Sequence, residues 1–149
     1  MSFSIKPIVL SLYDYSGNMV QPWLEADYEC WIVDIQHPAG IHREGNLVRV
    51  GADLMTWLPP RRKYAFCAAF PPCTHLAVSG ARWFRDKGLG KLSQAIALFA
   101  RAVELCEWTE APYLVENPVS TISSYFRKPD YTFDPCDYGN PYTKKTCLW

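Results

Sequence analysis

The sequence lacks an excess of charge of either sign. Its 149 residues carry 15 Lys and Arg against 15 Asp and Glu, so the formal net charge is zero. A neutral chain does not attract nucleic acid by bulk charge, because that attraction needs many cations set against the phosphate backbone. Only three short basic runs offer a grip for phosphates, at 61–63, 127–128 and 144–145, and such runs are otherwise ordinary solvated surface.

Long hydrophobic runs are also missing. The first residues contain no apolar stretch behind a basic start, which argues against a secretory signal. No segment approaches the roughly 20 apolar residues that a membrane-spanning helix needs. We therefore expect a soluble, cytoplasmic protein with no membrane partner.

The six cysteines are scattered and form no CxxC pair. A disulfide framework is therefore not expected, and Cys30, Cys67 and Cys106 are predicted to be thiols that fill the core. A zinc site built on Cys73 and His75 is conceivable, but the paired ligand spacing of structural zinc sites is absent. We predict no metal.

Two nucleotide-binding signatures are absent as well. There is no GxGxxG and no GxxxxGK[ST], which disfavours a dinucleotide or a nucleoside triphosphate as the ligand. Internal repeats and low-complexity segments are also lacking, so the length and the 49% hydrophobic content predict one ordinary globular domain.

Short apolar runs alternate with helical or connecting segments along the chain. Strands are predicted at 7–12, 28–34, 47–53, 64–70 and 112–117, with the start of another at 146–149. Helices are predicted at 19–27 and 92–108, with one or two helical turns at 119–126. The segments 37–46 and 127–143 are predicted to be loops. This alternation predicts an α/β fold with a mostly parallel sheet covered by helices.

Polar residues follow five of the predicted strands, always at the carboxyl end. They are Asp14 with Gly17, Asp34, Asp53, Cys73, and Glu116 with Asn117. In an open parallel sheet these ends share one edge, where ligands bind. Acids at such positions also serve as plain helix caps, and that alternative stays open for Asp34, Asp53 and Glu116.

This set of residues fits an adenosine-containing ligand. Gly17 lets the backbone approach a ligand, Asp34 suits a ribose diol, and Asp53 suits an adenine amino group. The sulfonium and amino-acid tail of S-adenosylmethionine suit an acidic pocket, so we expect S-adenosylmethionine as the cofactor.

Three motifs resemble those of the cytosine-C5 DNA methyltransferase family in order and spacing. They are Asp14-x-Ser16-Gly17-Asn18, Phe70-Pro71-Pro72-Cys73 and Val115-Glu116-Asn117-Pro118. The whole chain is similar to short phage-type DNA cytosine methyltransferases, with further matching stretches at 71–80 and 141–149.

The resemblance implies a class I methyltransferase, a Rossmann-like three-layer sandwich, as a single minimal domain over 1–149 without a target-recognition domain. It implies DNA as partner and the cytoplasm of a phage-infected or bacterial cell as location. Cys73 would attack C6 of cytosine and Glu116 would contact N3, with Asn117 as the third catalytic residue. Arg82, Lys144 and Lys145 are candidates for lowering the Cys73 pKa. The expected cofactor-binding residues are Asp14, Ser16, Gly17, Asn18, Asp34, Ile35, Asp53, Leu54, Phe70, Pro71 and Pro72.

Departures from the family pattern leave two alternatives open. The glycine-rich motif is reduced to Gly17, Thr74 replaces the usual glutamine, and Pro118 replaces the usual valine. The last strand stops early, which suggests a C-terminally shortened form. The alternatives are an enzyme that modifies C5 of a free pyrimidine nucleotide and a non-catalytic, cofactor-binding or interaction protein derived from a methyltransferase.

Overall fold

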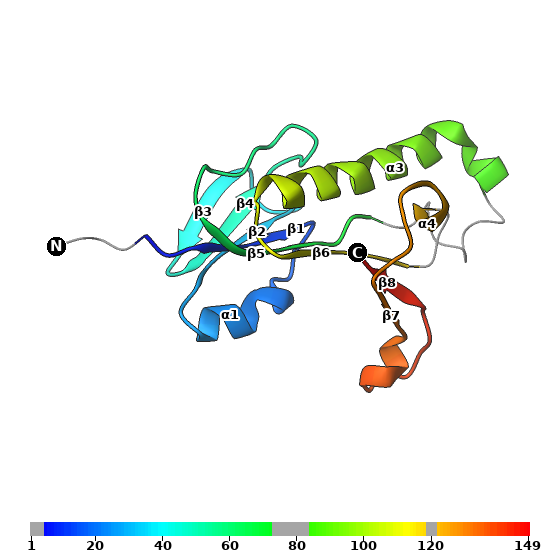
Figure 1. Cartoon of the computed structure of the whole chain (residues 1–149). Helices are drawn as coiled ribbons and strands as arrows, with labels where there is room; N and C mark the ends of the chain where they lie inside the picture. Colours follow the sequence, from blue (N-terminus) through cyan, green and yellow to red (C-terminus); the bar gives the residue numbers. More distant parts are fainter. Residues whose placement is uncertain (1–4, 73–83, 119–121) are drawn as a thin grey trace. The chain divides into compact units, whose positions relative to one another are not determined.

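The computed structural model describes residues 5–72, 84–118 and 122–149, which form two compact units. The first unit comprises Met1–Phe70 and Arg101–Tyr113, and the second comprises Pro71–Ala100 and Leu114–Trp149. The long helix α3 (Phe84–Trp108) and strand β6 (Tyr113–Pro118) belong in part to each. Figure 1 shows the course of the chain.

A mostly parallel sheet organises the first unit. Its strands are β1 (Ile8–Leu12), β2 (Glu29–Val33), β3 (Gly40–Glu44), β4 (Leu47–Gly51) and β5 (Tyr64–Ala69), in the order β3-β4-β2-β1-β5. The pairs β1–β2, β2–β4 and β1–β5 are parallel, whereas β3 is antiparallel to β4. In a Rossmann-like sheet, the three strands of the first half and the first strand of the second half lie side by side in the order 3-2-1-4. The parallel strands β4-β2-β1-β5 follow this order, which confirms the predicted fold class.

The parallel strands end in register. Leu12 lies opposite both Val33 and Ala69, and Val33 lies opposite Val50. The segments that leave β1, β2, β4 and β5 therefore emerge at one edge of the sheet, as the sequence predicted.

Helices cover both faces of this sheet. Neighbouring residues of a strand point to opposite faces, and Phe66 stacks on Trp23 of α1 (Gln21–Glu25), with ring centroids 5.5 Å apart. On the other face the Sγ atoms of Cys67 and Cys106 lie 3.3 Å apart, which places the C-terminal part of α3 there. The first unit is thus three-layered (Figure 1), as predicted.

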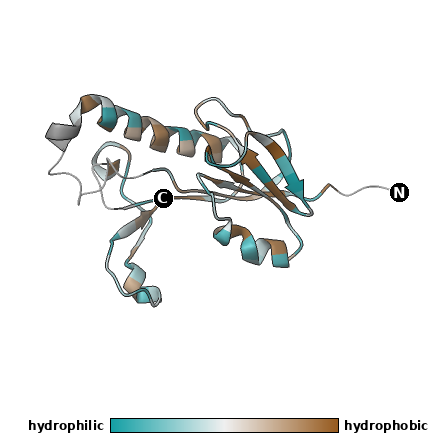
Figure 2. Ribbon diagram, turned by 180° about the vertical axis from the view of Figure 1, so that it is seen from behind, coloured by the Kyte–Doolittle hydropathy of each residue, from teal (hydrophilic) through white to brown (hydrophobic). Residues whose placement is uncertain are grey.

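The long helix α3 confirms and extends the helix predicted at 92–108. Its buried residues recur at helical spacing: Ala95, Phe99, Ala102, Leu105 and Cys106. Figure 2 shows the corresponding bands of hydrophobic and hydrophilic residues along it. Gly88, with φ 79 and ψ 161, breaks the helical backbone near its start. At the other predicted helix, 19–27, the structure has a 3₁₀ turn at Asn18–Val20 followed by α1.

The prediction of a loop at 37–46 is wrong. Strand β3 lies there and forms a hairpin with β4, with Gly45 in the turn at φ 59. All five residues of β3 are exposed, so this edge strand shows no apolar alternation that a sequence pattern could detect. The strand predicted at 47–53 ends at Gly51, so Asp53 follows β4 and does not close it.

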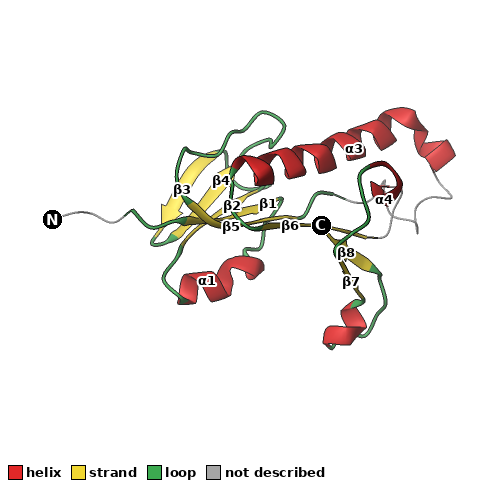
Figure 3. Cartoon of the chain, viewed as in Figure 1, coloured by secondary structure: helices red, strands yellow, loops and turns green. Residues whose placement is uncertain are grey.

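The second unit holds a small antiparallel sheet in the order β6-β8-β7, with β7 at Tyr131–Phe133 and β8 at Thr146–Leu148. The strand expected from 146 is therefore present. The prediction of a loop over 127–143 is wrong in part, because β7 and a 3₁₀ turn at Pro135–Tyr138 lie inside it (Figure 3). A three-residue strand between prolines is too short to show a period. One turn of helix, α4 (Ile122–Tyr125), precedes it.

An aromatic cluster holds the second unit together. The ring of Phe99 on α3 meets Trp149 edge to face at 5.4 Å and Phe126 at 5.9 Å. The indole Nε1 of Trp149 donates to Arg127 O at 2.8 Å. Among the described residues, no helix is long and apolar enough to cross a membrane.

Candidate functional site

A cavity of about 420 Å³ opens beside the segment that leaves β1. Four of the predicted cofactor-binding residues line it: Asp14, Ser16, Asn18 and Phe70. Its other wall residues, which the sequence did not single out, are Tyr13, Tyr15 and Met19. The volume lies within the range of small-molecule sites, and the position beyond the carboxyl ends of parallel strands is the usual one in this architecture.

The carboxylate of Asp14 organises the loop after β1. Asp14 is buried, and it accepts a hydrogen bond from Ser11 Oγ at 2.6 Å and another from the Gly17 backbone N–H at 2.8 Å. Gly17 has φ 74, a backbone conformation that favours glycine, and a Cβ there would lie 3.2 Å from Ile32 Cδ1. The glycine thus shapes the loop from behind, and it is not among the residues that line the cavity.

His37, which the sequence did not indicate, ties the end of β2 to this loop. Its Nε2 lies 3.1 Å from the carbonyl oxygen of Asp14, and because a carbonyl only accepts, Nε2 carries the proton. The ring of Tyr15 stacks on the imidazole with centroids 5.1 Å apart. In the sequence, the available signal was a histidine three residues after Asp34, the predicted ribose-binding acid.

The residues expected to bind ribose and adenine lie at the same edge but not in the cavity wall. Asp34 Oδ1 accepts from Gln36 N at 2.8 Å, and Asp53 Oδ1 accepts from Met55 N at 2.9 Å. Both carboxylates therefore cap the turns that follow them. Ile35 is 70% exposed, whereas Leu54 is buried.

A tyrosine in the cavity wall is held in its protonated form. Burial raises the pKa of Tyr13 to about 12, and the Asp53 carboxylate adds to this, while the charge of Arg101 opposes it. Arg101 is fixed by hydrogen bonds from Nε to Leu54 O at 2.9 Å and from Nη2 to Trp57 O at 3.0 Å. The Tyr13 hydroxyl therefore carries its proton throughout the physiological pH range.

The second unit carries the predicted glutamate. Glu116 and Asn117 are neighbours in β6, paired with Leu148 and Cys147 respectively, so their side chains point to opposite faces of the strand. Burial raises the pKa of Glu116, and the charge of Lys144 opposes that shift. Only one of the two side chains can therefore face a given ligand.

Asn117 is completely buried, and within the described residues neither its Nδ2 nor its Oδ1 has a hydrogen-bond partner. The predicted nucleophile Cys73, with His75 and Arg82, lies outside the described residues. Of the two residues immediately before Cys73, Pro71 is buried and Pro72 is exposed. No group of His, Cys, Asp and Glu residues suited to a metal ion occurs within 5–72, 84–118 and 122–149.

Neither a family profile nor a curated protein sequence matches the chain. Among solved structures, the CcbJ methyltransferase from Streptomyces caelestis aligns with 87% of this chain and 49% of its own, at 15% identity and a TM-score of 0.42. The glycopeptide N-methyltransferase MtfA, complexed with (S)-adenosyl-L-homocysteine, aligns with 97% of this chain and 57% of its own, at 13% identity and a TM-score of 0.41. Another structure of MtfA aligns with 98% and 66%, at 14% identity and the same TM-score, 0.41. The chain thus spans about half to two thirds of these proteins, and its fold assignment rests on its own strand order.

Proposed function

We propose that the chain is a class I methyltransferase that uses S-adenosylmethionine and methylates C5 of cytosine in DNA. The observation that carries the proposal is the cavity at the carboxyl ends of β1 and β5, whose wall includes Asp14, Ser16, Asn18 and Phe70. These four residues come from two of the three motifs that resemble the cytosine-C5 family.

The cavity residues fit the cofactor. At about 420 Å³ the cavity has the size of a small-molecule site. Ser16 and Asn18 offer polar groups to an amino-acid tail, and the ring of Phe70 offers an apolar surface. S-adenosylmethionine, when bound, supplies an electrophilic methyl group.

The proposed chemistry follows from the poor nucleophilicity of C5. The Cys73 thiolate adds to C6 of cytosine, and the electron pair displaced from the C5–C6 bond makes C5 nucleophilic. Glu116 stabilises this species by giving a proton to N3, which the burial-raised pKa of its carboxyl supports. C5 would then take the methyl group as the methyl–sulfur bond breaks. A base removes the C5 proton, the thiolate leaves C6, and N3 returns its proton to the Glu116 carboxylate.

Cofactor binding is tested by calorimetry on the full chain. S-adenosylmethionine should release heat with the wild type and not with Ser16→Trp, whose indole fills the cavity. The matched control is Ser93→Trp, at an exposed serine of α3, and it should bind as the wild type does. Absence of heat with the wild type at high cofactor concentration would refute every methyltransferase assignment for this chain.

The chemistry is tested with 5-fluorocytosine DNA, whose fluorine blocks the final elimination and traps the covalent adduct. A cofactor-dependent adduct should form with the wild type and with Cys136→Ala, which removes an exposed cysteine, but not with Cys73→Ala. An adduct in Cys73→Ala would mean that another nucleophile acts. An adduct with a fluorinated free nucleotide but not with DNA would transfer the proposal to that substrate. Cofactor binding without any adduct would favour the non-catalytic alternative.

A further inference from the structure

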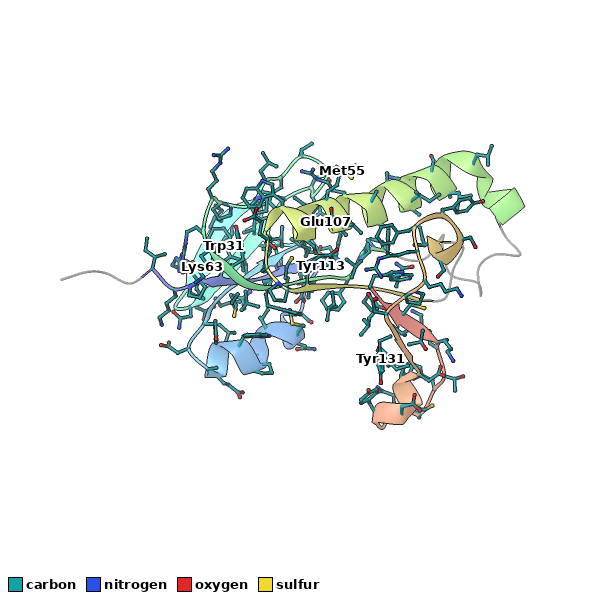
Figure 4. All side chains as sticks on the ribbon, in the orientation of Figure 1. Trp31, Met55, Lys63, Glu107, Tyr113 and Tyr131 are labelled. Atoms are coloured by element: carbon teal, nitrogen blue, oxygen red, sulfur yellow. The ribbon has the colours of Figure 1, made fainter. Side chains whose placement is uncertain are left out.

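A second cavity, of about 510 Å³ and widely open to solvent, lies in the first unit at the amino end of β5. Its lining comes from the segment before β5 and from the segment that ends α3: Arg61, Arg62, Lys63, Trp108, Thr109 and Glu110. Lys63, labelled in Figure 4, directly precedes β5, whereas Phe70 of the first cavity directly follows it. Six strand residues separate the two, which places these cavities roughly 20 Å apart at opposite ends of the strand.

The three basic residues of this cavity differ in their bonding. The guanidinium of Arg62 is already hydrogen-bonded within the protein, because it donates to both carboxylate oxygens of Glu29 and to Lys6 O. Arg61 and Lys63 are exposed and make no ion pair or side-chain hydrogen bond within the part of the chain that the structure describes. Glu110, in the same wall, is not paired with either of them. Two cations therefore line one hollow without a partner.

An aromatic side chain stands beside these cations. Trp108, the last residue of α3, is 42% exposed, and its ring meets Tyr64 edge to face at 6.1 Å. That contact fixes the indole while leaving much of its surface to solvent. A held, exposed aromatic next to free cations is the combination with which proteins bind single-stranded nucleic acid, because bases stack on the ring and phosphates bind the cations.

We propose that this cavity binds a short segment of single-stranded nucleic acid. Arg61 and Lys63 bind consecutive phosphates, a base stacks on Trp108, and the Glu110 carboxylate accepts a hydrogen bond from an exocyclic amino group of that base. The proposal goes beyond methyl transfer and holds whether or not the first cavity takes S-adenosylmethionine. It also gives a neutral chain the local basic patch that nucleic-acid binding requires.

A simpler role for the cations would be to neutralise the partial negative charge at the C terminus of α3. Two backbone bonds close that terminus, from Thr109 N to Cys106 O and from Glu110 N to Glu107 O. Arg61 and Lys63 donate to neither carbonyl, so the helix end does not account for them. An acidic peptide could also bind the two cations, but its carboxylates do not stack on the exposed indole of Trp108 as a base does.

Fluorescence anisotropy with a labelled dC8 oligonucleotide tests the proposal on the full chain. Arg61→Ala/Lys63→Ala should weaken binding and should lower the slope of log Kd against log salt by about 1.4, since each lost phosphate contact of a single strand contributes about 0.7. The control is Lys91→Ala/Arg49→Ala, which removes the same charge from positions outside the three basic runs and should leave the slope unchanged. Trp108→Leu should weaken dC8 binding about 10-fold and should leave binding of an abasic octamer unchanged.

Each remaining outcome overturns the proposal. Equal loss in the two double variants would mean attraction by bulk charge. Equal binding of dC8 and abasic DNA by the wild type would remove the stacked base. Preference for polyglutamate over dC8 would assign the cavity to an acidic peptide. A lowered melting temperature of Arg61→Ala/Lys63→Ala with unchanged binding would assign these cations to the helix end. Calorimetry with S-adenosylmethionine on the same variants tests the proposed function independently, so a failure of oligonucleotide binding can be told apart from a failure of cofactor binding.

Discussion

Glu29→Gln should lower the stability of the protein in a way that depends on pH. Glu29 lies at the start of β2 and is 8% exposed. Its carboxylate accepts hydrogen bonds from three side chains, Arg62 at 3.0 and 3.1 Å, Trp31 Nε1 at 2.8 Å and Arg43 at 3.0 Å. Burial alone would raise the pKa of Glu29, but these donors outweigh it and lower the pKa from 4.5 to about 2.

That shift sets an upper bound on the effect. A change from 4.5 to about 2 corresponds to at most about 3.4 kcal/mol of folding free energy. The Arg43 side chain is 52% exposed, so solvent screens part of the interaction, and we expect Glu29→Gln to cost about 1.5–2 kcal/mol at pH 7. Because the folded-state pKa is lowered, the unfolded chain binds the proton more tightly. The stabilisation is therefore complete above about pH 4.5 and is lost as the pH falls toward 2.

Urea unfolding followed by circular dichroism measures the difference between wild type and variant. That difference should fall to less than half of its pH 7 value by pH 3. The matched control is Glu44→Gln, which removes an ion pair of the same N–O length, 3.0 Å to Arg49, from a glutamate side chain that is 80% exposed, and which should change stability very little. A difference that stays constant between pH 7 and pH 3, or a Glu44→Gln effect as large as that of Glu29→Gln, would refute this reasoning.

Three further changes probe other parts of the chain. Gly17→Ala places a side chain on a backbone with φ 74 and against Ile32, so it should lower the free energy of unfolding in urea by about 1–2 kcal/mol. It should also weaken the heat of S-adenosylmethionine binding. An unfolding free energy equal to that of the wild type would contradict this reasoning. Glu116→Gln should slow adduct formation on 5-fluorocytosine DNA at least about 100-fold. Because the folded-state pKa of Glu116 is raised, ionisation weakens the wild-type fold as the pH rises, so the variant should be no less stable at pH 8, and a clear loss of stability there would speak against the raised pKa. Iodoacetamide should label the exposed Cys136 rapidly and the buried Cys67, whose pKa is raised, very slowly; mass spectrometry of tryptic peptides with equal labelling would contradict that burial.

The sequence predicted the parallel core because buried strands leave a strong pattern. Strands β1, β2 and β5 are covered on both faces, so each reads as a run of apolar residues. The exposed β3 and the three-residue β7 leave no such pattern, because neither buries an apolar face. These two segments form strands because they pair with β4 and β8, and such pairing cannot be recognised from a short stretch of sequence.

The site was predictable where it depends on topology. Asp14 and Phe70 were expected at one edge because parallel strands end there, and they line one cavity. Met19 and Tyr13 could not be recognised, because an apolar or aromatic wall residue looks like a core residue in sequence. Asp34 and Asp53 each accept a hydrogen bond from a backbone N–H two residues on, and a capping acid has the same sequence signature as a ligand-binding acid.

The loop after β1 is ordered by the chain itself. Ser11, Gly17 and His37 all bond to Asp14, through its carboxylate or its carbonyl oxygen. The conformational entropy of this loop is therefore lost when the protein folds and not when a ligand binds. Two kinetic consequences follow. The amide of Gly17 should exchange slowly with solvent deuterium in the free protein, and changes in cofactor affinity among wall variants should appear in the dissociation rate, with association nearly constant.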